Sequence, residues 1–198
     1  MAGHLGDLDS RSLRGSSNLS LLRGYLSASG SRDGRVLEMF KKKESKPKVR
    51  VLFVEQKNDF ASQMAEYFAR QLYDDSYELY SAGPEKDIMD CDMISSMYDS
   101  GEDIRRQISK DFKDRDFLRE DEDYDFVIYM DKPTFDEWSG RTPWKGKQIL
   151  AQVKQRSEFT ATDDLELFHE YVASMNEVKE WVRVHLEDLE SLKSMVVA

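Results

Sequence analysis

The sequence predicts an α/β protein with a small parallel sheet and helices on both of its sides. Apolar segments at residues 49–54, 77–81 and 125–130 are typical of strands that are covered on both faces. Apolar residues recur at helical spacing between these segments and after the last of them. Strands that alternate with helices form parallel sheets, because each helix carries the chain back across the sheet.

The first predicted strand, residues 48–54, leads through a polar loop into a helix that ends near residue 74. Ser62 is a residue type that caps helix N-termini, so we expect it to cap this helix. The predicted inner face of the helix repeats every three or four positions and comprises Met64, Ala65, Phe68, Ala69 and Leu72.

The middle of the chain repeats this alternation. A second strand is expected at residues 77–81, with "AGP" at 82–84 ending it. A helix over residues 90–100 turns Met93, Ile94 and Met97 inward and ends at Gly101. Residues 103–118 are predicted to form a short extended piece and then a broken helix.

The last third contains a strand at residues 125–130, a helical turn at 133–138, a fourth strand at 147–153 and one long helix at 163–195. The apolar stripe of that helix predicts a face packed on the sheet: Phe168, Tyr171, Val172, Met175, Val178, Val182, Leu186 and Leu189. The aromatic residues Tyr129, Trp138 and Trp144 fit either an interface or the core.

Residues 1–46, here called the N-terminal arm, are rich in Ser, Gly and Arg and predict an extended or disordered basic segment. The folded domain is expected over residues 47–198. A targeting peptide is the rival interpretation, although Asp7, Asp9, Asp33 and Glu38 are unusual in one. Apolar anchors in the arm predict contacts with a protein partner: Leu21, Leu22, Tyr25, Leu26, Leu37, Met39 and Phe40.

The formal net charge of −10 is unevenly distributed. Residues 1–48 carry about +5, so the rest of the chain carries about −15, which argues against nucleic-acid binding by the domain. No apolar run approaches the ~20 residues of a transmembrane helix. The single cysteine, Cys91, excludes an intramolecular disulfide. We expect a cytoplasmic protein, with an organelle stroma as the alternative.

The stretch from the first strand into its helix is the most informative for function. Strand, loop and helix N-terminus are where α/β proteins bind anions, because free N–H groups of the helix point at the loop. Metal chemistry has no support here, since His4, His169 and His185 are the only histidines and no Cys/His cluster has ligand spacing. No metal and no cofactor are therefore expected.

Several short segments, in order, resemble the low-molecular-weight protein tyrosine phosphatases and their thioredoxin-linked arsenate reductase relatives. They are "VRVLFV", "N…SQMAEYFAR", "YSAGPE", "DSGEDIRRQISK" and "DFVIYMDK", followed by the long terminal helix. The resemblance covers roughly residues 48–190. It implies a flavodoxin-like three-layer sandwich with a four-stranded parallel sheet, and a phosphate loop at the point where the strand order reverses.

In the family the loop carries a nucleophilic cysteine and a phosphate-binding arginine. The resemblance puts Glu55 at the cysteine position and Ala61 at the arginine position, while Asn58 and Ser62 are kept and Lys57 replaces a frequent glycine. A carboxylate cannot form the thiophosphate intermediate and repels a phosphate dianion. The family's general acid corresponds to Asp163 or Asp164, for which a helix cap is the simpler interpretation.

These substitutions predict a protein without catalytic residues and not an enzyme, that is, a pseudophosphatase. We expect it to act as a binding, linker or assembly subunit of a larger complex, with the N-terminal arm docking on partners. An enzyme with altered, phosphatase- or reductase-like chemistry that uses Glu55 is the alternative. A further hypothesis is that Glu55, or the neighbouring Asp59, fills the loop as a built-in anion and satisfies its amides.

Overall fold

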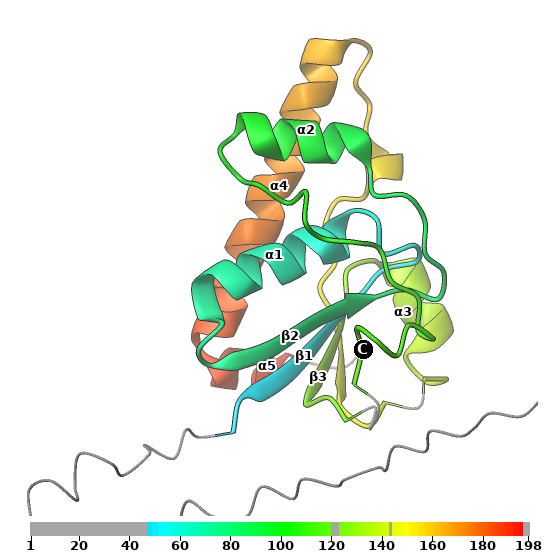
Figure 1. Cartoon of the computed structure of the whole chain (residues 1–198), viewed down its shortest axis with the longest axis vertical. Helices are drawn as coiled ribbons and strands as arrows, with labels where there is room; N and C mark the ends of the chain where they lie inside the picture. Colours follow the sequence, from blue (N-terminus) through cyan, green and yellow to red (C-terminus); the bar gives the residue numbers. More distant parts are fainter. Residues whose placement is uncertain (1–46, 120–122, 143, 196–198) are drawn as a thin grey trace, which may run out of the picture. The chain divides into compact units, whose positions relative to one another are not determined.

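The computed structural model describes residues 47–119, 123–142 and 144–195 (Figure 1). The chain divides into two units, Met1–Ser45 and Lys46–Ala198, and every helix and strand described belongs to the second. The N-terminal arm and its apolar anchors lie outside the described residues. The docking of the arm therefore stays a prediction.

Four parallel strands form the sheet, in the order β2-β1-β3-β4. They are β1 (Val49–Val54), β2 (Tyr77–Ala82), β3 (Phe126–Tyr129) and β4 (Lys147–Leu150). This confirms the predicted α/β fold with its four-stranded parallel sheet. Within the sheet, β2 lies on one side of β1 and β3 lies on the other, so the strand order reverses at β1. The carboxyl ends of β1 and β3 therefore border the crevice where such sheets bind ligands.

Side chains of β1 alternate between two cores, because successive residues of a strand point to opposite faces. Val51 and Phe53 pack on one side with Met64 and Phe68 of α1 (Ala61–Tyr73). That side also holds α2 (Cys91–Asp99), α4 (Asp164–Glu187) and α5 (Leu189–Ser194) (Figure 1). The buried face of each of these helices therefore contributes to one continuous core.

The opposite side of the sheet has a thinner cover. Leu52 and Val54 pack there with Tyr129, with Phe135 of α3 (Lys132–Trp138) and with Trp144. Tyr129 is fully buried and Trp144 is 7% exposed, and Trp138 packs against the same cluster. The aromatic residues that fitted either a core or an interface therefore form a core.

Two details of α1 differ from the prediction. Ser62 does not cap the helix, because α1 begins at Ala61 after Phe60, and both the N–H and the hydroxyl of Ser62 bond to Glu55. Leu72 is 43% exposed and does not belong to the inner face. The other four residues predicted for that face are fully buried: Met64, Ala65, Phe68 and Ala69.

Residues 103–118 contain no helix, contrary to the prediction. Their backbone bonds elsewhere: the N–H of Lys110 donates to the Asn58 side chain, and the N–H of Phe112 donates to the carbonyl of Gly83. Asp111 forms an isolated parallel bridge with Gly83. The segment runs across the end of β2 and braces the loop that follows β1.

The fourth strand and the terminal helix are shorter than predicted. β4 ends at Leu150, although Ala151 and Val153 each still donate a backbone bond toward β3, to Tyr129 and Met130. The terminal helix breaks at Asp188, whose backbone is extended and whose side chain caps α5 through the N–H of Glu190. No helix among the described residues is long and apolar enough to cross a membrane.

Candidate functional site

The loop between β1 and α1 closes around the side chain of Glu55, which is 5% exposed. Oε2 of Glu55 accepts from the N–H of Phe60 at 3.2 Å and of Ser62 at 3.1 Å, and from Ser62 Oγ at 2.9 Å. Oε1 accepts from the N–H of Ala61 at 3.0 Å. These backbone donors have no partner within α1, since they belong to its first turn. The carboxyl group therefore lies where a bound anion would lie.

Asn58 shapes the loop from inside. Its φ of +50° lies in the left-handed region, which Asn tolerates better than most residues. Nδ2 donates to Ser62 Oγ at 2.8 Å, and Oδ1 accepts from Gln63 Nε2 at 2.7 Å and from the Lys110 N–H at 2.8 Å. The buried Asn58 side chain thus orients the serine that donates to Glu55.

Burial and hydrogen bonding act in opposite directions on Glu55. Burial is the larger effect and raises the pKa of Glu55 from 4.5 to about 7, with a smaller contribution from the nearby Asp59 carboxylate. The bonds from Ser62 and Ala61 lower the pKa and oppose this rise. The loop therefore holds a carboxyl group that changes charge near neutral pH.

Glu55, and not Asp59, occupies the position that the sequence-based hypothesis gives to a built-in anion. Asp59 is partly exposed, and its carboxylate accepts none of the hydrogen bonds from the first turn of α1. Ala61 contributes its backbone N–H alone, as its side chain is a buried methyl group. Of the four loop residues named from the sequence, three are joined by hydrogen bonds between their side chains, namely Glu55, Asn58 and Ser62.

Asp163 and Asp164, the candidates for the family's general acid, are not among the residues that line the pocket at this loop. Asp163 caps α4 by accepting from the N–H of Glu166 at 2.8 Å. Both residues line a separate hollow beside Phe159 and Leu167. The helix-cap interpretation is therefore confirmed for Asp163.

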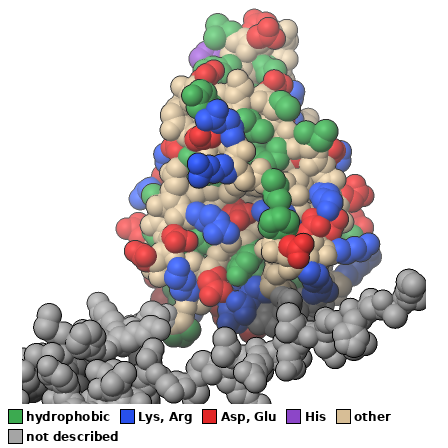
Figure 2. All heavy atoms as spheres, in the orientation of Figure 1, with side chains coloured by type: hydrophobic (Ala, Val, Ile, Leu, Met, Phe, Trp, Pro, Cys, Tyr) green, Lys and Arg blue, Asp and Glu red, His purple; other side chains and the backbone are tan. Residues whose placement is uncertain are grey.

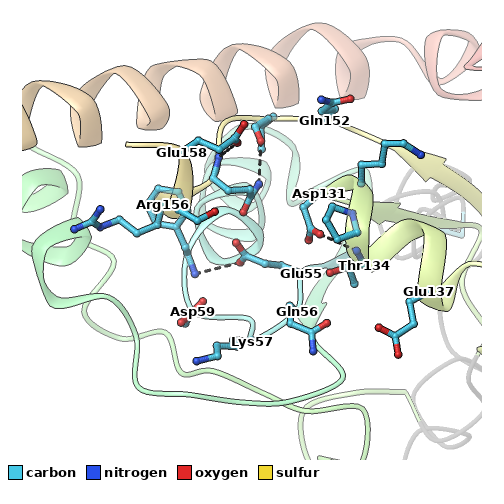
Figure 3. A pocket seen from close by; sticks show the side chains of 16 residues that line it. Glu55, Gln56, Lys57, Asp59, Asp131, Thr134, Glu137, Gln152, Arg156 and Glu158 are labelled. Atoms are coloured by element: carbon cyan, nitrogen blue, oxygen red, sulfur yellow. Dashed lines mark hydrogen bonds between the residues drawn. The ribbon is translucent and has the colours of Figure 1, made fainter. Parts of the chain in front are cut away.

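A pocket of about 880 Å³ opens beside Glu55, between the loop and the residues that follow β3 and β4 (Figure 3). Asp131 and Thr134 of the β3–α3 junction form one wall, and Val153 and Arg156 form another. Asp131 was not predicted from the sequence as a site residue. Its position directly after a buried strand, at the same sheet edge as Glu55, was the signal that could have identified it.

Gly83, within the segment "YSAGPE", is required by close packing. A Cβ atom there would lie 2.3 Å from the carbonyl oxygen of Glu55 and 2.9 Å from that of Gln56. Real Cβ atoms do not approach oxygen so closely, so only glycine lets β2 pass the loop. No local sequence pattern singled out this residue for the geometry of the site.

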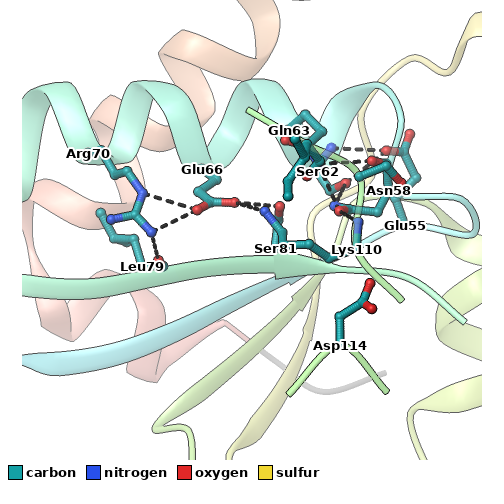
Figure 4. Close-up of polar contacts among 12 residues, drawn as sticks. Glu55, Asn58, Ser62, Gln63, Glu66, Arg70, Leu79, Ser81, Lys110 and Asp114 are labelled. Atoms are coloured by element: carbon teal, nitrogen blue, oxygen red, sulfur yellow. Dashed lines mark hydrogen bonds and ion pairs between the residues drawn. The ribbon is translucent and has the colours of Figure 1, made fainter. Parts of the chain in front are cut away.

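A buried ion pair lies behind the loop (Figure 4). Glu66 and Lys110 are 5% and 6% exposed, and Lys110 Nζ donates to Glu66 Oε2 at 2.8 Å. The same carboxylate accepts from Ser81 Oγ at 2.5 Å and from Arg70 Nη2 at 2.8 Å. Because the Lys110 N–H also holds Asn58, this network links the loop to β2 and α1.

No group of His, Cys, Asp and Glu side chains in the described part of the chain is arranged to hold a metal ion. Cys91 is a free, exposed thiol at the start of α2. Cys91 is not among the residues that line the pocket at the loop.

Residues 50–190 match the family of low molecular weight phosphotyrosine protein phosphatases. The match covers more than half of the chain, and the protein belongs to this family. No curated protein sequence matches it.

Solved structures share the fold. An Erwinia amylovora tyrosine phosphatase, amsI, is 12% identical with a TM-score of 0.53, and the alignment covers 78% of this chain and 97% of that one. Vibrio vulnificus Wzb in complex with benzylphosphonate is 15% identical with a TM-score of 0.53, covering 70% and 97%. An arsenate reductase in the phosphate-binding state is 28% identical with a TM-score of 0.48, covering 68% and 94%.

The family match contradicts the prediction that the chain is not an enzyme, because the family is one of phosphatases. The prediction rested on the absence of Cys and Arg from the loop. The loss of one nucleophile excludes one mechanism and does not exclude other chemistry at the same pocket.

Proposed function

We propose that this member of the phosphatase family binds protein partners as a linker or assembly subunit of a larger complex. The observation that carries the proposal is the position of Glu55, whose carboxyl group takes the donors that would otherwise bind an external anion. An ionised Glu55 also repels a phosphate dianion. Recognition is then a task for other surfaces of the chain.

The N-terminal arm is the proposed docking segment. It carries a net positive charge and places apolar side chains among Ser, Gly and Arg residues, such as Leu22 and Tyr25 in its middle and Phe40 near its C-terminal end. Segments of this composition bind by ordering on a partner, with the apolar residues as anchors. The acidic domain makes a protein partner a better fit than a nucleic acid.

The test compares the full-length chain with residues 47–198, both tagged and expressed at native abundance. The complex recovered is measured by native mass spectrometry, and thermal unfolding verifies that the shorter chain stays folded. We expect removal of the arm to abolish a stoichiometric complex. An unchanged complex, with a folded domain in both cases, would refute docking through the arm.

A matched variant refines this test. Replacing Leu21, Leu22, Tyr25 and Leu26 together with serine removes apolar anchors without changing the charge of the arm. The control replaces four serines of the arm with alanine. We expect the first variant to lose the complex and the control to keep it, since apolar anchors contribute most of the binding free energy.

Catalysis with altered chemistry is a second candidate, and one observation favours it. The pKa of Glu55, raised to about 7 by burial, suits a general base, and Glu55 lines the pocket. In this mechanism Glu55 takes a proton from the water that attacks the phosphorus of an aryl phosphate, and the aryl group leaves as a phenolate. Turnover of aryl phosphate by the wild type that is lost in Glu55→Ala would support it, and equal turnover in both proteins would refute it.

A further inference from the structure

We propose that the pocket beside Glu55 binds a cationic side chain, arginine or lysine, of a protein partner. The inference rests on the proposed partner-binding function and assigns a chemistry to one contact. The geometry that supports it is an excess of carboxyl groups without a cationic partner around a pocket with apolar walls. A phosphate group, the ligand expected of a phosphatase loop, has the opposite charge.

Acidic side chains outnumber basic ones around the pocket. Five carboxyl groups line it, against two lysines and one arginine. They approach from both sides of the crevice: Glu55 and Asp59 from the loop after β1, and Asp131 and Glu137 from the junction with α3 and from that helix (Figure 3). By contrast, acidic and basic side chains alternate over the face drawn in Figure 2, without gathering by sign.

The basic residues of the lining are already paired with acids that do not line the pocket. Lys57 Nζ lies 2.7 Å from Asp87 Oδ2, and Lys132 Nζ lies 2.8 Å from Asp136 Oδ1. Arg156 donates to Tyr171 Oη at 2.6 Å and lies 3.8 Å from Asp90 Oδ2. These cations therefore do little to neutralise the pocket.

The lining acids lack such partners. Within the described residues, no ion pair joins a Lys, Arg or His to Asp59, Asp131 or Glu137. This contrast makes the pocket a region of negative potential, which low-polarity walls strengthen. A cation that entered would be attracted without breaking an existing ion pair.

Asp131 provides a second, independent observation. It is only 8% exposed, and its Oδ1 accepts from the N–H of Thr134 at 2.8 Å. Its Oδ2 is buried and has no hydrogen-bond partner among the described residues, and the same is true of Thr134 Oγ1. Buried polar atoms without partners are rare and call for an explanation. A cation held in the pocket would supply the compensation that the fold omits.

The pocket also has apolar surface for the stem of a long side chain. Phe60 and Val153 are 3% exposed and line it together with Pro133. Arginine and lysine bury a hydrocarbon stem while their head group seeks an acid, which fits this lining. A small inorganic cation would leave the apolar part of the pocket unused.

The test titrates full-length protein with a doubly capped glycyl-arginyl-glycine peptide, followed by NMR of labelled backbone amides. The same peptide with citrulline, the neutral isostere of arginine, is the matched ligand. We expect the arginine peptide to shift the amides of Phe60, Thr134 and Val153 and to bind about three- to tenfold more tightly than the citrulline peptide. Equal affinity, or shifts confined to other residues, would overturn the proposal.

Variants separate charge from structure. Asp131→Asn keeps the oxygen that caps α3, and together with Glu137→Gln it should reduce the preference for arginine over citrulline to less than about twofold. The control is Asp99→Asn, an exposed acid at the end of α2 and outside the pocket lining, which should leave the preference unchanged. An unchanged preference in the double variant would overturn the assignment.

Inorganic phosphate serves as the opposing probe, and stronger shifts of the pocket amides with phosphate than with the arginine peptide would also overturn the proposal. Failure of this contact is distinguishable from failure of the proposed function. If the arginine peptide does not bind but the arm still forms its stoichiometric complex, only the pocket assignment is wrong. If the full-length protein forms no complex while the peptide binds, the proposed assembly function is wrong and the pocket assignment stands.

Discussion

Two buried carboxyl groups lie at the same edge of the sheet, and their surroundings differ sharply. Glu55 follows β1 and receives four hydrogen bonds from the start of α1. Asp131 follows β3 and receives one from α3 at Oδ1, while its Oδ2 has no partner in the described part of the chain. The comparison shows that the loop after β1 is internally complete, whereas the junction after β3 leaves binding capacity unused.

The cause lies in the loops that precede the two helices. Five residues separate Glu55 from Ala61, and Asn58 turns them back so that the first turn of α1 faces the carboxyl group. Asp131 stands directly before α3, where one side chain reaches one backbone N–H in the usual capping geometry. A long loop thus encloses an anion, and a short junction only caps a helix.

The largest expected effect concerns the close packing behind Glu55. Gly83→Ala places a methyl group 2.3 Å from the carbonyl oxygen of Glu55, and backbone on both sides leaves it no room to move. We expect the free energy of unfolding to fall by at least about 3 kcal/mol, measured by urea denaturation. Gly140→Ala is the control, because no atom of the residues that the structure describes lies within 4 Å of the added methyl group. Equal losses in both variants would refute this packing.

The pH dependence of stability distinguishes Glu55 from an ordinary surface acid. Its folded pKa of about 7 lies above the unfolded value of 4.5, so the native state binds more protons between these values. The contribution of Glu55 to stability is therefore greatest below about pH 4.5 and is lost as the pH rises through about 7.

Between about pH 5 and about pH 8, wild type should lose about 2–3 kcal/mol relative to Glu55→Gln, which cannot titrate. Chemical denaturation at both pH values measures the difference. Parallel stability curves for the two proteins would mean that the pKa of Glu55 is close to its usual value.

A smaller effect is expected when the carboxyl group is removed near neutral pH. Glu55→Ala leaves the N–H groups of Phe60, Ala61 and Ser62 without their acceptor, which should cost about 1–2 kcal/mol, in part offset by the loss of a buried charge. Asp59→Ala, in the same loop, should change stability by less than about 0.5 kcal/mol. If Asp59→Ala is the more damaging variant, the loop is organised differently.

The smallest effect concerns the other carboxyl group of the comparison. Asp131→Ala removes the cap of α3 and should cost about 1 kcal/mol in thermal or chemical unfolding. Asp131→Asn keeps the cap and should differ from wild type by less than about 0.5 kcal/mol. A large loss in the Asn variant would show that the unpartnered oxygen has a structural partner.

Much of this arrangement could be predicted from the sequence, because strong periodicity identified β1, β2 and β3 and the inner face of α1. The position of Glu55 at the end of β1 followed from the same pattern. The misplaced cap at Ser62 had a physical cause, since a side chain seven residues away took over the donors that a cap would satisfy.

The other misses share one origin in tertiary contacts between distant segments. Residues 103–118 form no helix, and the N–H groups of Lys110 and Phe112 bond to Asn58 and Gly83 instead. The pocket is assembled from residues that follow three different strands, so no local pattern could indicate Asp131 and Val153 together. The break at Asp188 in the terminal helix arose inside a continuous apolar stripe, which carried no stop signal.

The central claim is that Glu55 is the internal anion of the loop, and inorganic phosphate tests it most directly. The melting temperatures of wild type and Glu55→Ala are measured at about pH 8, with and without phosphate, against chloride at equal ionic strength. We predict no change for wild type and a rise for Glu55→Ala equivalent to about 1–2 kcal/mol, because phosphate then binds the vacated N–H groups. An equal rise in both proteins would contradict the claim.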